Sequence, residues 1–133
     1  MIAALIPICV IRLLRFVGRE GRGNQPAWFR QALEIARAQF SENITSAGLA
    51  RQIGTTQAQL ARAFRRFQHQ SVREFVDDLR MIEARLQLLN SDLSVAQIAQ
   101  RLGYFDQSHF GRHFRNRFHV SPARFRTIRR GQE

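Results

Sequence analysis

Two pairs of arginines stand at equal spacing in two parts of the chain. Arg62 and Arg65 are three residues apart, and Arg112 and Arg115 repeat that pair 50 residues further on. A guanidinium is a planar set of donors that can bind a phosphate, or the O6 and N7 atoms of guanine, through two hydrogen bonds at once. One such arginine would more often be solvated or paired with an acid, but the same pair in two places favours contact with DNA.

The histidines and the single cysteine indicate no catalytic or metal chemistry. His109 and His113 stand at i and i+4, a spacing at which two imidazoles could bind one metal ion. No HExxH motif, cysteine pair or glycine-rich phosphate loop accompanies them, so packing or surface roles are favoured. Cys9 alone excludes an internal disulfide and fits a reducing cytoplasm. The sequence predicts no enzyme, no catalytic residue, no metal site and no cofactor.

The two arginine pairs lie inside a longer internal repeat. Residues 50–54, ARQIG, return as residues 99–103, AQRLG, and the matching positions that follow are offset by 50 instead of 49. In that later part Leu60, Phe64, His69, Ser71 and Phe75 are matched by Phe110, Phe114, His119, Ser121 and Phe125. A repeat of this kind is one supersecondary unit used twice. Two helical segments around a glycine turn indicate a helix-turn-helix.

Helix start signals define the expected elements. N-capping side chains, or a proline suited to the first turn, predict helices that begin at Pro26, Thr45, Thr56, Ser71, Ser94, Asp106 and Ser121. Capping-box spacing occurs at Thr56 with Gln59 and at Ser71 with Glu74. The longest helix, over about residues 72–90, would measure about 28 Å. No segment alternates like a strand, so the sequence predicts an all-α fold of about seven helices.

The second helix of each repeat has an apolar face and a face of small residues and arginines. The apolar stripes are Leu60, Phe64 and Phe67 in the first, and Phe110, Phe114 and Phe118 in the second. Their helical spacing places these side chains in the core. The opposite faces carry Ala58, Ala61, Arg62 and Arg65, and Ser108, Gly111, Arg112 and Arg115. Because small side chains permit close approach to bases, this face suits a helix in a major groove.

Length, composition and charge restrict the class of protein. The chain of 133 residues fits one domain or two small subdomains, and its 44% hydrophobic content can supply a modest core. The net formal charge of +11 indicates an anionic partner, either nucleic acid or an anionic membrane surface. All 21 basic residues are arginine, for which codon bias in a GC-rich genome is the favoured explanation. In residues 103–130 arginines dominate and Asp106 is the only acid.

Residues 1–25 differ from the helical part that follows them. The run from Ile2 to Ile11 is apolar, but Arg12 and Arg15 interrupt it well before the roughly 20 residues that a membrane-spanning helix needs. Those arginines follow the apolar run and a polar, glycine-rich linker comes next, so a secretory signal is disfavoured. Three interpretations stay open: part of an upstream packing or dimerisation helix, a weak membrane-associating segment, or sequence upstream of the true start.

The second repeat carries a specific family resemblance. Residues 93–126, LSVAQIAQRLGYFDQSHFGRHFRNRFHVSPARFR, resemble the signature of the AraC/XylS-type transcriptional regulators. The first repeat and the stretch RMIEARL at residues 80–86 resemble the rest of that family's DNA-binding domain. The resemblance implies a domain over residues 26–133, with a first helix-turn-helix at about 45–67, a linker helix at about 72–90 and a second helix-turn-helix at about 94–118. Two recognition helices would read successive major-groove segments about 34 Å apart.

The resemblance also implies roles for individual residues. The positions that would contact bases are Gln57, Ala58, Ala61, Arg62, Gln107, Ser108, Gly111 and Arg112. The positions that would contact phosphates are Arg65, Arg66, Arg115 and Arg117. The implied partner is double-stranded DNA, with RNA polymerase as a further candidate. The chain is expected to act as a monomer in the cytoplasm, at the nucleoid, without a small-molecule site.

Three features depart from the family pattern. His69 and His119 stand where the family usually has a glycine in the left-handed conformation, which histidine adopts at a modest cost. Gly111, in the middle of a recognition helix, costs about 1 kcal/mol relative to alanine. Ala58 and Ala61 leave the first recognition helix few donors for bases, so it is expected to add affinity more than specificity.

The sequence therefore predicts a sequence-specific DNA-binding transcription factor. The alternative is a truncated or membrane-associated interaction protein that binds nucleic acid non-specifically. Family members commonly carry an upstream ligand-binding or dimerisation domain, whereas about 25 residues precede the domain in this chain, which is compatible with a truncated regulator. RNA binding is disfavoured because no aromatic platform on a sheet is expected.

Overall fold

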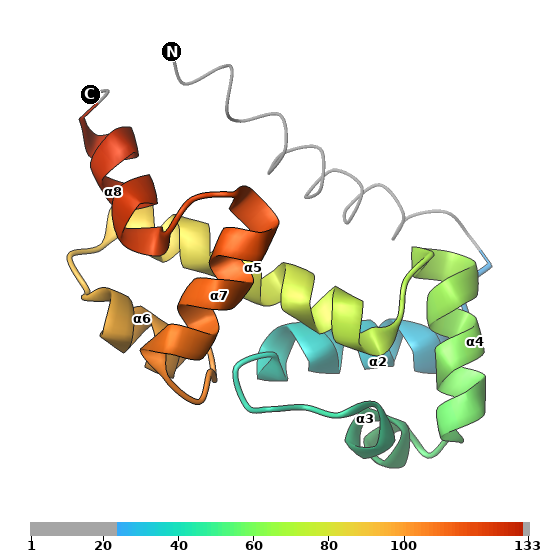
Figure 1. Cartoon of the computed structure of the whole chain (residues 1–133). Helices are drawn as coiled ribbons and strands as arrows, with labels where there is room; N and C mark the ends of the chain where they lie inside the picture. The colour runs from blue at the N-terminus through green and yellow to red at the C-terminus, as the bar shows by residue number, and fades with distance from the viewer. Residues whose placement is uncertain (1–23, 132–133) are drawn as a thin grey trace. The chain divides into compact units, whose positions relative to one another are not determined.

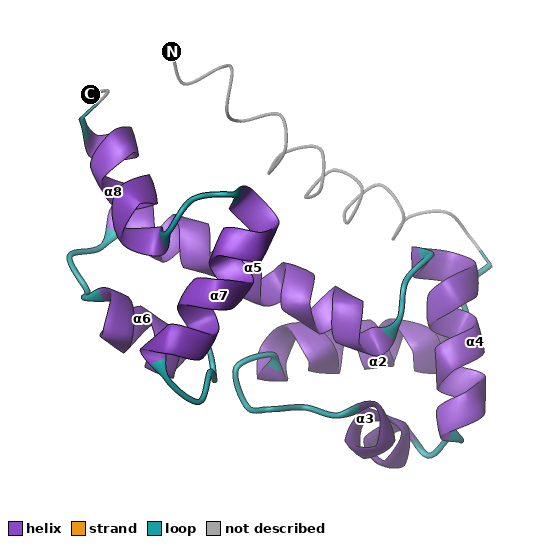
Figure 2. Cartoon of the chain, viewed as in Figure 1, coloured by secondary structure: helices purple, strands orange, loops and turns teal. Residues whose placement is uncertain are grey.

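The computed structural model describes residues 24–131, which form helices joined by loops (Figures 1 and 2). The helices are α2 (Ala27–Gln39), α3 (Ser46–Ile53), α4 (Gln57–Gln68), α5 (Val72–Asn90), α6 (Val95–Arg101), α7 (Gln107–Phe118) and α8 (Pro122–Arg130). No strand occurs within the described range. For residues 24–131, the prediction of an all-α fold of about seven helices is confirmed. Among these helices, none combines the length and the apolar character needed to cross a membrane.

The apolar run near the N-terminus lies outside the described residues. The three interpretations of this segment therefore remain predictions from the sequence.

The predicted start signals cap the helices. A side-chain oxygen accepts a hydrogen bond from the backbone nitrogen three residues later at Thr45, Thr56, Ser94, Asp106 and Ser121. At Ser71 the capping box is complete. Glu74 Oε2 accepts from the Ser71 nitrogen at 2.8 Å, and Ser71 Oγ accepts from the Glu74 nitrogen at 3.1 Å. These bonds satisfy N–H groups that have no partner inside the helix, so local sequence determines where each helix begins.

The capping box predicted at Thr56 is only half formed. Thr56 Oγ1 accepts a hydrogen bond from the Gln59 nitrogen at 3.1 Å. The side-chain oxygen of Gln59, however, accepts from the hydroxyl of Thr55 at 2.7 Å. This neighbouring hydroxyl takes the place of the Thr56 backbone nitrogen, a competition that hydroxyl side chains commonly introduce near helix ends. The helix still starts where predicted, because the Thr56 bond remains.

The chain divides into two compact units. Among the described residues, the first unit holds residues 24–39 and Ile44–Val76, and the second holds Phe40–Asn43 and residues 77–131. The boundary passes through α5, and the loop between α2 and α3 contributes a short segment to the second unit. Each unit therefore contains one helix-turn-helix and part of α5, so α5 belongs to both cores as well as connecting them.

In the first unit, α2 packs against the helix-turn-helix formed by α3 and α4. Phe29 of α2 is fully buried, and its ring meets the ring of Phe64 edge-on with centroids 5.1 Å apart. Phe64 in turn meets Phe75 at 5.3 Å. Burial of each such side chain contributes about 1.5–3 kcal/mol, and edge-to-face geometry adds to this. The helix that the sequence predicts to begin at Pro26 thus covers the first repeat.

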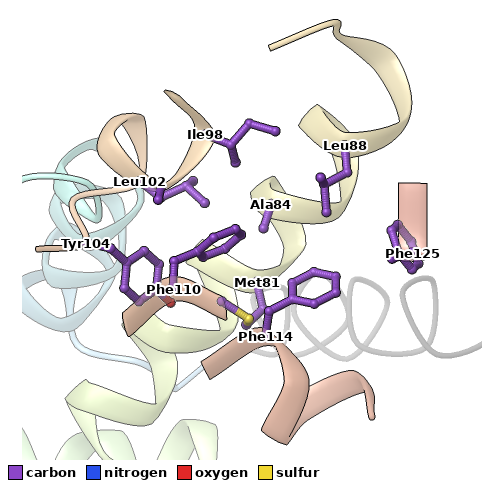
Figure 3. Close-up of a cluster of buried hydrophobic side chains, with 10 residues drawn as sticks. Met81, Ala84, Leu88, Ile98, Leu102, Tyr104, Phe110, Phe114 and Phe125 are labelled. Carbon is purple, nitrogen blue, oxygen red and sulfur yellow. The ribbon is translucent and has the colours of Figure 1, made fainter. Parts of the chain in front are cut away.

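In the second unit, α5 and α7 supply five of the ten residues of one buried cluster (Figure 3). Met81, Ala84 and Leu88 lie on one face of α5 because their spacing follows the helical period. Phe110 and Phe114 of α7 are fully buried in the same cluster. The apolar stripes predicted from the sequence thus lie in the two cores, with Phe67 and Phe118 at the edges, where they are partly exposed.

Each helix-turn-helix turns at a glycine and ends at a histidine. Gly54 and Gly103 adopt φ angles of 82° and 86°, the left-handed region that glycine enters most easily. His69 and His119 end α4 and α7 with φ angles of 56° and 61°. The left-handed conformation predicted at the two histidines is confirmed, and each backbone nitrogen still donates to the carbonyl of the residue four positions earlier.

Candidate nucleic-acid interface

Helix α4 buries one side and exposes the other. Leu60, Ala63 and Phe64 are buried, which determines how the helix is rotated against its unit. The residues predicted to contact DNA lie on the opposite side: Gln57, Ala58, Arg62, Arg65 and Arg66 are exposed and Ala61 is partly exposed. The helix therefore presents short side chains in its first turns with arginines following them.

Helix α7 repeats this arrangement in the second unit. Phe110 and Phe114 are buried. On the other side Gln107, Ser108, Arg112 and Arg115 are exposed and Gly111 is partly exposed. Because the exposed positions match those of α4 at an offset of 50, the two helices present the same kind of surface. The structure brings together within each helix the residues that the sequence assigned to it.

Arg62 and Arg112 are matched arginines on these two surfaces. Nε of Arg62 lies 3.4 Å from the carbonyl oxygen of Ala58, a long hydrogen bond within the helix. In residues 24–131, neither Arg62 nor Arg112 pairs with an acid. A cation without an internal partner remains free to neutralise a phosphate or to bind a base edge.

Arg117 differs from the other predicted phosphate contacts. Its guanidinium pairs with the carboxylate of Asp78 on α5, and the two side chains are only 26% and 20% exposed. A phosphate contact would require Arg117 to share or leave this ion pair. The role assigned to Arg117 from the sequence stays a prediction, and the structure adds a contact within the second unit that the sequence did not indicate.

Two further arginines of the basic C-terminal part hold the end of α5. Arg126 Nε donates to the carbonyl oxygen of Leu88 at 3.0 Å, and Nη2 donates to that of Ser91 at 3.3 Å. Arg130 Nη1 lies 3.1 Å from the carboxylate of Asp92. Carbonyls at a helix C-terminus have no partner inside the helix. Part of the positive charge of residues 103–130 therefore stabilises the fold.

The two histidines of α7 pack with Tyr104 in a small polar and aromatic cluster. The Tyr104 hydroxyl lies 3.3 Å from Nδ1 of His113, and the Tyr104 ring meets those of His109 and His113 at centroid distances of 5.4 and 5.8 Å. Burial raises the pKa of the Tyr104 hydroxyl well above its usual range, and the nearby Asp77 carboxylate raises it further, whereas Arg80 acts in the opposite direction. Across residues 24–131, no three side chains of the metal-binding types gather into a cluster.

Packing within the protein does not require a glycine at position 111. A Cβ atom built on it would meet no atom within 4 Å, so alanine would fit. Glycine in the middle of a helix costs about 1 kcal/mol relative to alanine. The space beside Gly111 is open on the face that carries Ser108 and Arg112, where an outside partner could approach the backbone.

A shallow depression flanks α4 in the first unit. Its lining includes Trp28, Thr55, Arg62, Arg66 and Phe67. The guanidinium of Arg66 lies over the ring of Phe67, 5.3 Å from the centroid, which restrains this arginine beside the exposed face of the helix. The depression is therefore positively charged and continuous with the residues predicted to contact DNA.

Comparison with known proteins identifies the family. Residues 49–128 match a family described as "Helix-turn-helix domain". The chain is 32% identical over 114 residues to the HTH-type transcriptional activator RhaS of Salmonella schwarzengrund, a match that covers 86% of this chain and 40% of RhaS. A transcriptional regulator of Chromobacterium violaceum, described as having an AraC-type DNA-binding domain, is similar in structure with a TM-score of 0.70 and 25% identity, over 77% of this chain and 91% of that one. The chain belongs to the AraC-type helix-turn-helix family.

The AraC-type fold is also shared with a protein solved on DNA. The DNA-binding domain of the transcriptional factor AdpA, in complex with a target DNA, matches with a TM-score of 0.75 and 24% identity, over 79% of this chain and 95% of that one. The chain spans less than half the length of the curated relatives it matches. It carries the DNA-binding domain of an AraC-family transcriptional regulator, a family of regulators rather than of enzymes.

The two histidines that end α4 and α7 can now be compared with the family pattern expected from the sequence. His69 and His119, the two departures from that pattern, occupy the left-handed positions after α4 and α7. Both recognition helices nevertheless end at these positions. The two histidines therefore adopt the left-handed backbone conformation that was expected at these positions.

Proposed function

We propose that this chain binds double-stranded DNA in a sequence-specific manner and regulates transcription, with α4 and α7 each placed in a major groove. One observation carries the proposal. The two recognition helices expose the same face of small residues and arginines, while their matched aromatic residues are buried. A solvated charged face would not need short side chains at matching positions in both copies, whereas close approach to base edges does.

The residues divide into two groups by the part of DNA that they would contact. Base edges would be read by Gln57, Ala58, Ala61 and Arg62 of α4 and by Gln107, Ser108, Gly111 and Arg112 of α7. Phosphates would be bound by Arg65, Arg66 and Arg115, with Arg117 as a further candidate. Arg62 and Arg112 suit a bidentate contact with guanine. Because Ala58 and Ala61 offer no donors, α7 would contribute more of the specificity.

The proposal extends to partners and location. The chain would bind its site as a monomer, because each copy already carries two recognition helices. A regulator of this kind would meet RNA polymerase at promoters, which makes the polymerase a candidate second partner. Its target is chromosomal DNA, so the protein would act in the cytoplasm, at the nucleoid.

Selection from a random duplex library tests the proposal. The purified full chain is incubated with the library at near-physiological salt, because affinity for DNA depends steeply on salt. Two enriched sequence blocks about one helical turn apart are expected, since two recognition helices in successive major grooves have that spacing. A matched control combines Arg62→Ala with Arg112→Ala. Because both side chains are exposed, this double variant should keep its fold. Because it lacks both arginines proposed to bind guanine, it should enrich no sequence.

Other outcomes contradict all or part of the proposal. One enriched block would assign recognition to a single helix and leave the other as a clamp on the backbone. Strong salt-dependent binding without any enrichment would contradict sequence-specific recognition and favour a protein that binds nucleic acid non-specifically. A preference for RNA over duplex DNA in competition would contradict the proposed target.

A further inference from the structure

Phe105 is the most exposed large apolar side chain in residues 24–131. Its side chain is 94% exposed, compared with 48% for Leu86, the next in order. Phe105 lies immediately before Asp106, whose carboxylate caps the N-terminus of α7 by accepting from the His109 nitrogen at 2.7 Å. A phenyl ring in water at the tip of a recognition helix has no benefit for the isolated protein.

Phe105 does not make the contact that an apolar residue at this position usually makes. A residue that precedes the N-cap often packs against the fourth residue of the helix, in a contact called the hydrophobic staple. The fourth residue of α7 is Phe110, which is fully buried. Tyr104 covers it instead, with ring centroids 5.2 Å apart. Phe105, at 94% exposed, therefore does not make the contact that would explain it as a folding element.

The first repeat shows that the helix-turn-helix does not require an aromatic residue here. Its turn is one residue shorter, because Thr55 and Thr56 follow Gly54, whereas Tyr104, Phe105 and Asp106 follow Gly103. The nitrogens of Thr55 and Tyr104 make the same turn hydrogen bond, to the carbonyl oxygens of Ala50 and Ala99, so Thr55 matches Tyr104, and Phe105 has no counterpart. Thr55 is partly buried and its hydroxyl donates to Gln59 Oε1 at 2.7 Å. The two turns thus differ in length, and the extra residue of the second turn is the exposed aromatic Phe105.

We propose that Phe105 is a specificity-determining residue that packs on the C5-methyl group of a thymine in the DNA segment read by α7. This inference rests on the proposed function. Residues at the N-terminal end of a recognition helix approach base edges in the major groove. The thymine methyl is the apolar group that the major groove offers there, so it is the natural partner for a ring held at that end of α7. Ser108 and Arg112 would read neighbouring base pairs from the same helix.

Deoxyuridine substitution tests this contact without changing base pairing. The block read by α7 is first identified as the one whose preference Arg112→Ala relaxes. Each thymine of that block is then replaced by deoxyuridine, which removes only the methyl group, and binding of the full chain is measured. One replacement is expected to weaken binding by the wild-type chain about fourfold, the effect of one buried methyl group. Phe105→Ala should bind the thymine and uridine duplexes equally.

Two further variants complete the comparison. Phe105→Leu keeps an apolar side chain and should retain part of the difference between the duplexes. Leu86→Ala removes an exposed apolar side chain from α5 and should retain the full difference. Phe105→Ala is expected to melt at the wild-type temperature, because the ring is almost entirely exposed.

Several results would overturn the inference while leaving the proposed function in place. These are a selected α7 block without thymine, a wild-type chain indifferent to every uridine, and a Phe105→Ala variant that keeps the fourfold difference. A Phe105→Ala variant that binds the selected DNA normally but fails to regulate transcription would also overturn the inference, and would favour a contact between Phe105 and another protein. If the chain selects no sequence block at all, the proposed function and this inference both fail.

Discussion

A Cβ atom on Gly103 would lie 2.3 Å from the carbonyl oxygen of Ser41. Gly103 forms the turn of the second helix-turn-helix, and Ser41 belongs to the segment Phe40–Asn43 that packs in the same unit. Arg80 binds that segment too, through a hydrogen bond from its Nε to the carbonyl oxygen of Phe40 at 2.9 Å. A stretch of chain that precedes the first helix-turn-helix is thus part of the structure that supports the second.

The first prediction follows from this contact. Gly103→Ala should lower the free energy of unfolding by about 3 kcal/mol, because a backbone clash adds to the cost of a left-handed residue. Gly54→Ala is the matched control, since Gly54 has a similar φ angle but open space around its Cβ position. Its cost should be about 1 kcal/mol. Urea denaturation measures both, and equal losses would contradict the role of Ser41.

The second prediction separates stability from binding at Gly111. Gly111→Ala should stabilise the protein by up to about 1 kcal/mol, because a Cβ fits in open space and alanine favours the helix. The same change should weaken binding to the selected DNA if the backbone of α7 approaches the bases closely. Thermal melting and a binding titration on one preparation give both values. Unchanged affinity would show that the glycine has no role in DNA contact.

The third prediction distinguishes base contact from phosphate contact. Arg112→Ala should relax base preference at one position by about 1–3 kcal/mol, as expected for loss of a bidentate contact. Arg115→Ala should weaken binding to all sequences alike and lower the salt slope by about one unit. Titrations on specific and random duplexes at several salt concentrations test both. Equal losses on the two duplexes for Arg112→Ala would remove its assignment as a base reader.

The fourth prediction concerns the ion pair of Arg117 and Asp78. Because both side chains are partly exposed, Arg117→Ala and Asp78→Asn should each lower the free energy of unfolding by only about 1 kcal/mol. The double variant should lose little more than either single variant, since they remove one shared interaction. Additive losses would contradict the pairing. A reduced salt slope of DNA binding for Arg117→Ala would support the phosphate contact predicted from the sequence.

The fifth prediction is a pH dependence that arises from Tyr104, the only tyrosine in the chain. Its burial raises the pKa in the folded state, whereas in the unfolded chain the phenol ionises near pH 10. The stabilisation is complete below that pH and is lost as the pH rises above it, because the unfolded state then releases a proton that the folded state keeps. Absorbance of tyrosinate should therefore appear together with unfolding. Its appearance near pH 10 in a fully helical protein would contradict this, and Tyr104→Phe should show a weaker alkaline loss of stability.

The helix ends and the orientation of the recognition helices were predictable because both depend on short-range patterns. Ser71 and Glu74 form their capping box from residues that are neighbours in the sequence. Phe110 and Phe114 lie on one side of α7 and Arg112 on the other because of the helical period. The half-formed capping box at Thr56 was not predictable, because the adjacent hydroxyl of Thr55 competes for the same side chain.

The sequence by itself determined the helices, their exposed and buried faces, the turn residues and the repeat, because caps and periodicity act over a few residues along the chain. Only the tertiary structure decided which charges are free. Nothing in the sequence distinguishes Arg117 and Arg126 from the other arginines. In the structure Arg117 pairs with Asp78, 39 residues earlier in the chain. Arg126 binds the carbonyl oxygen of Leu88, 38 residues earlier, at the end of α5. The exposure of Phe105 was decided in the same way. Whether its ring is buried depends on which aromatic residue covers Phe110, and the packing of Tyr104 settles that.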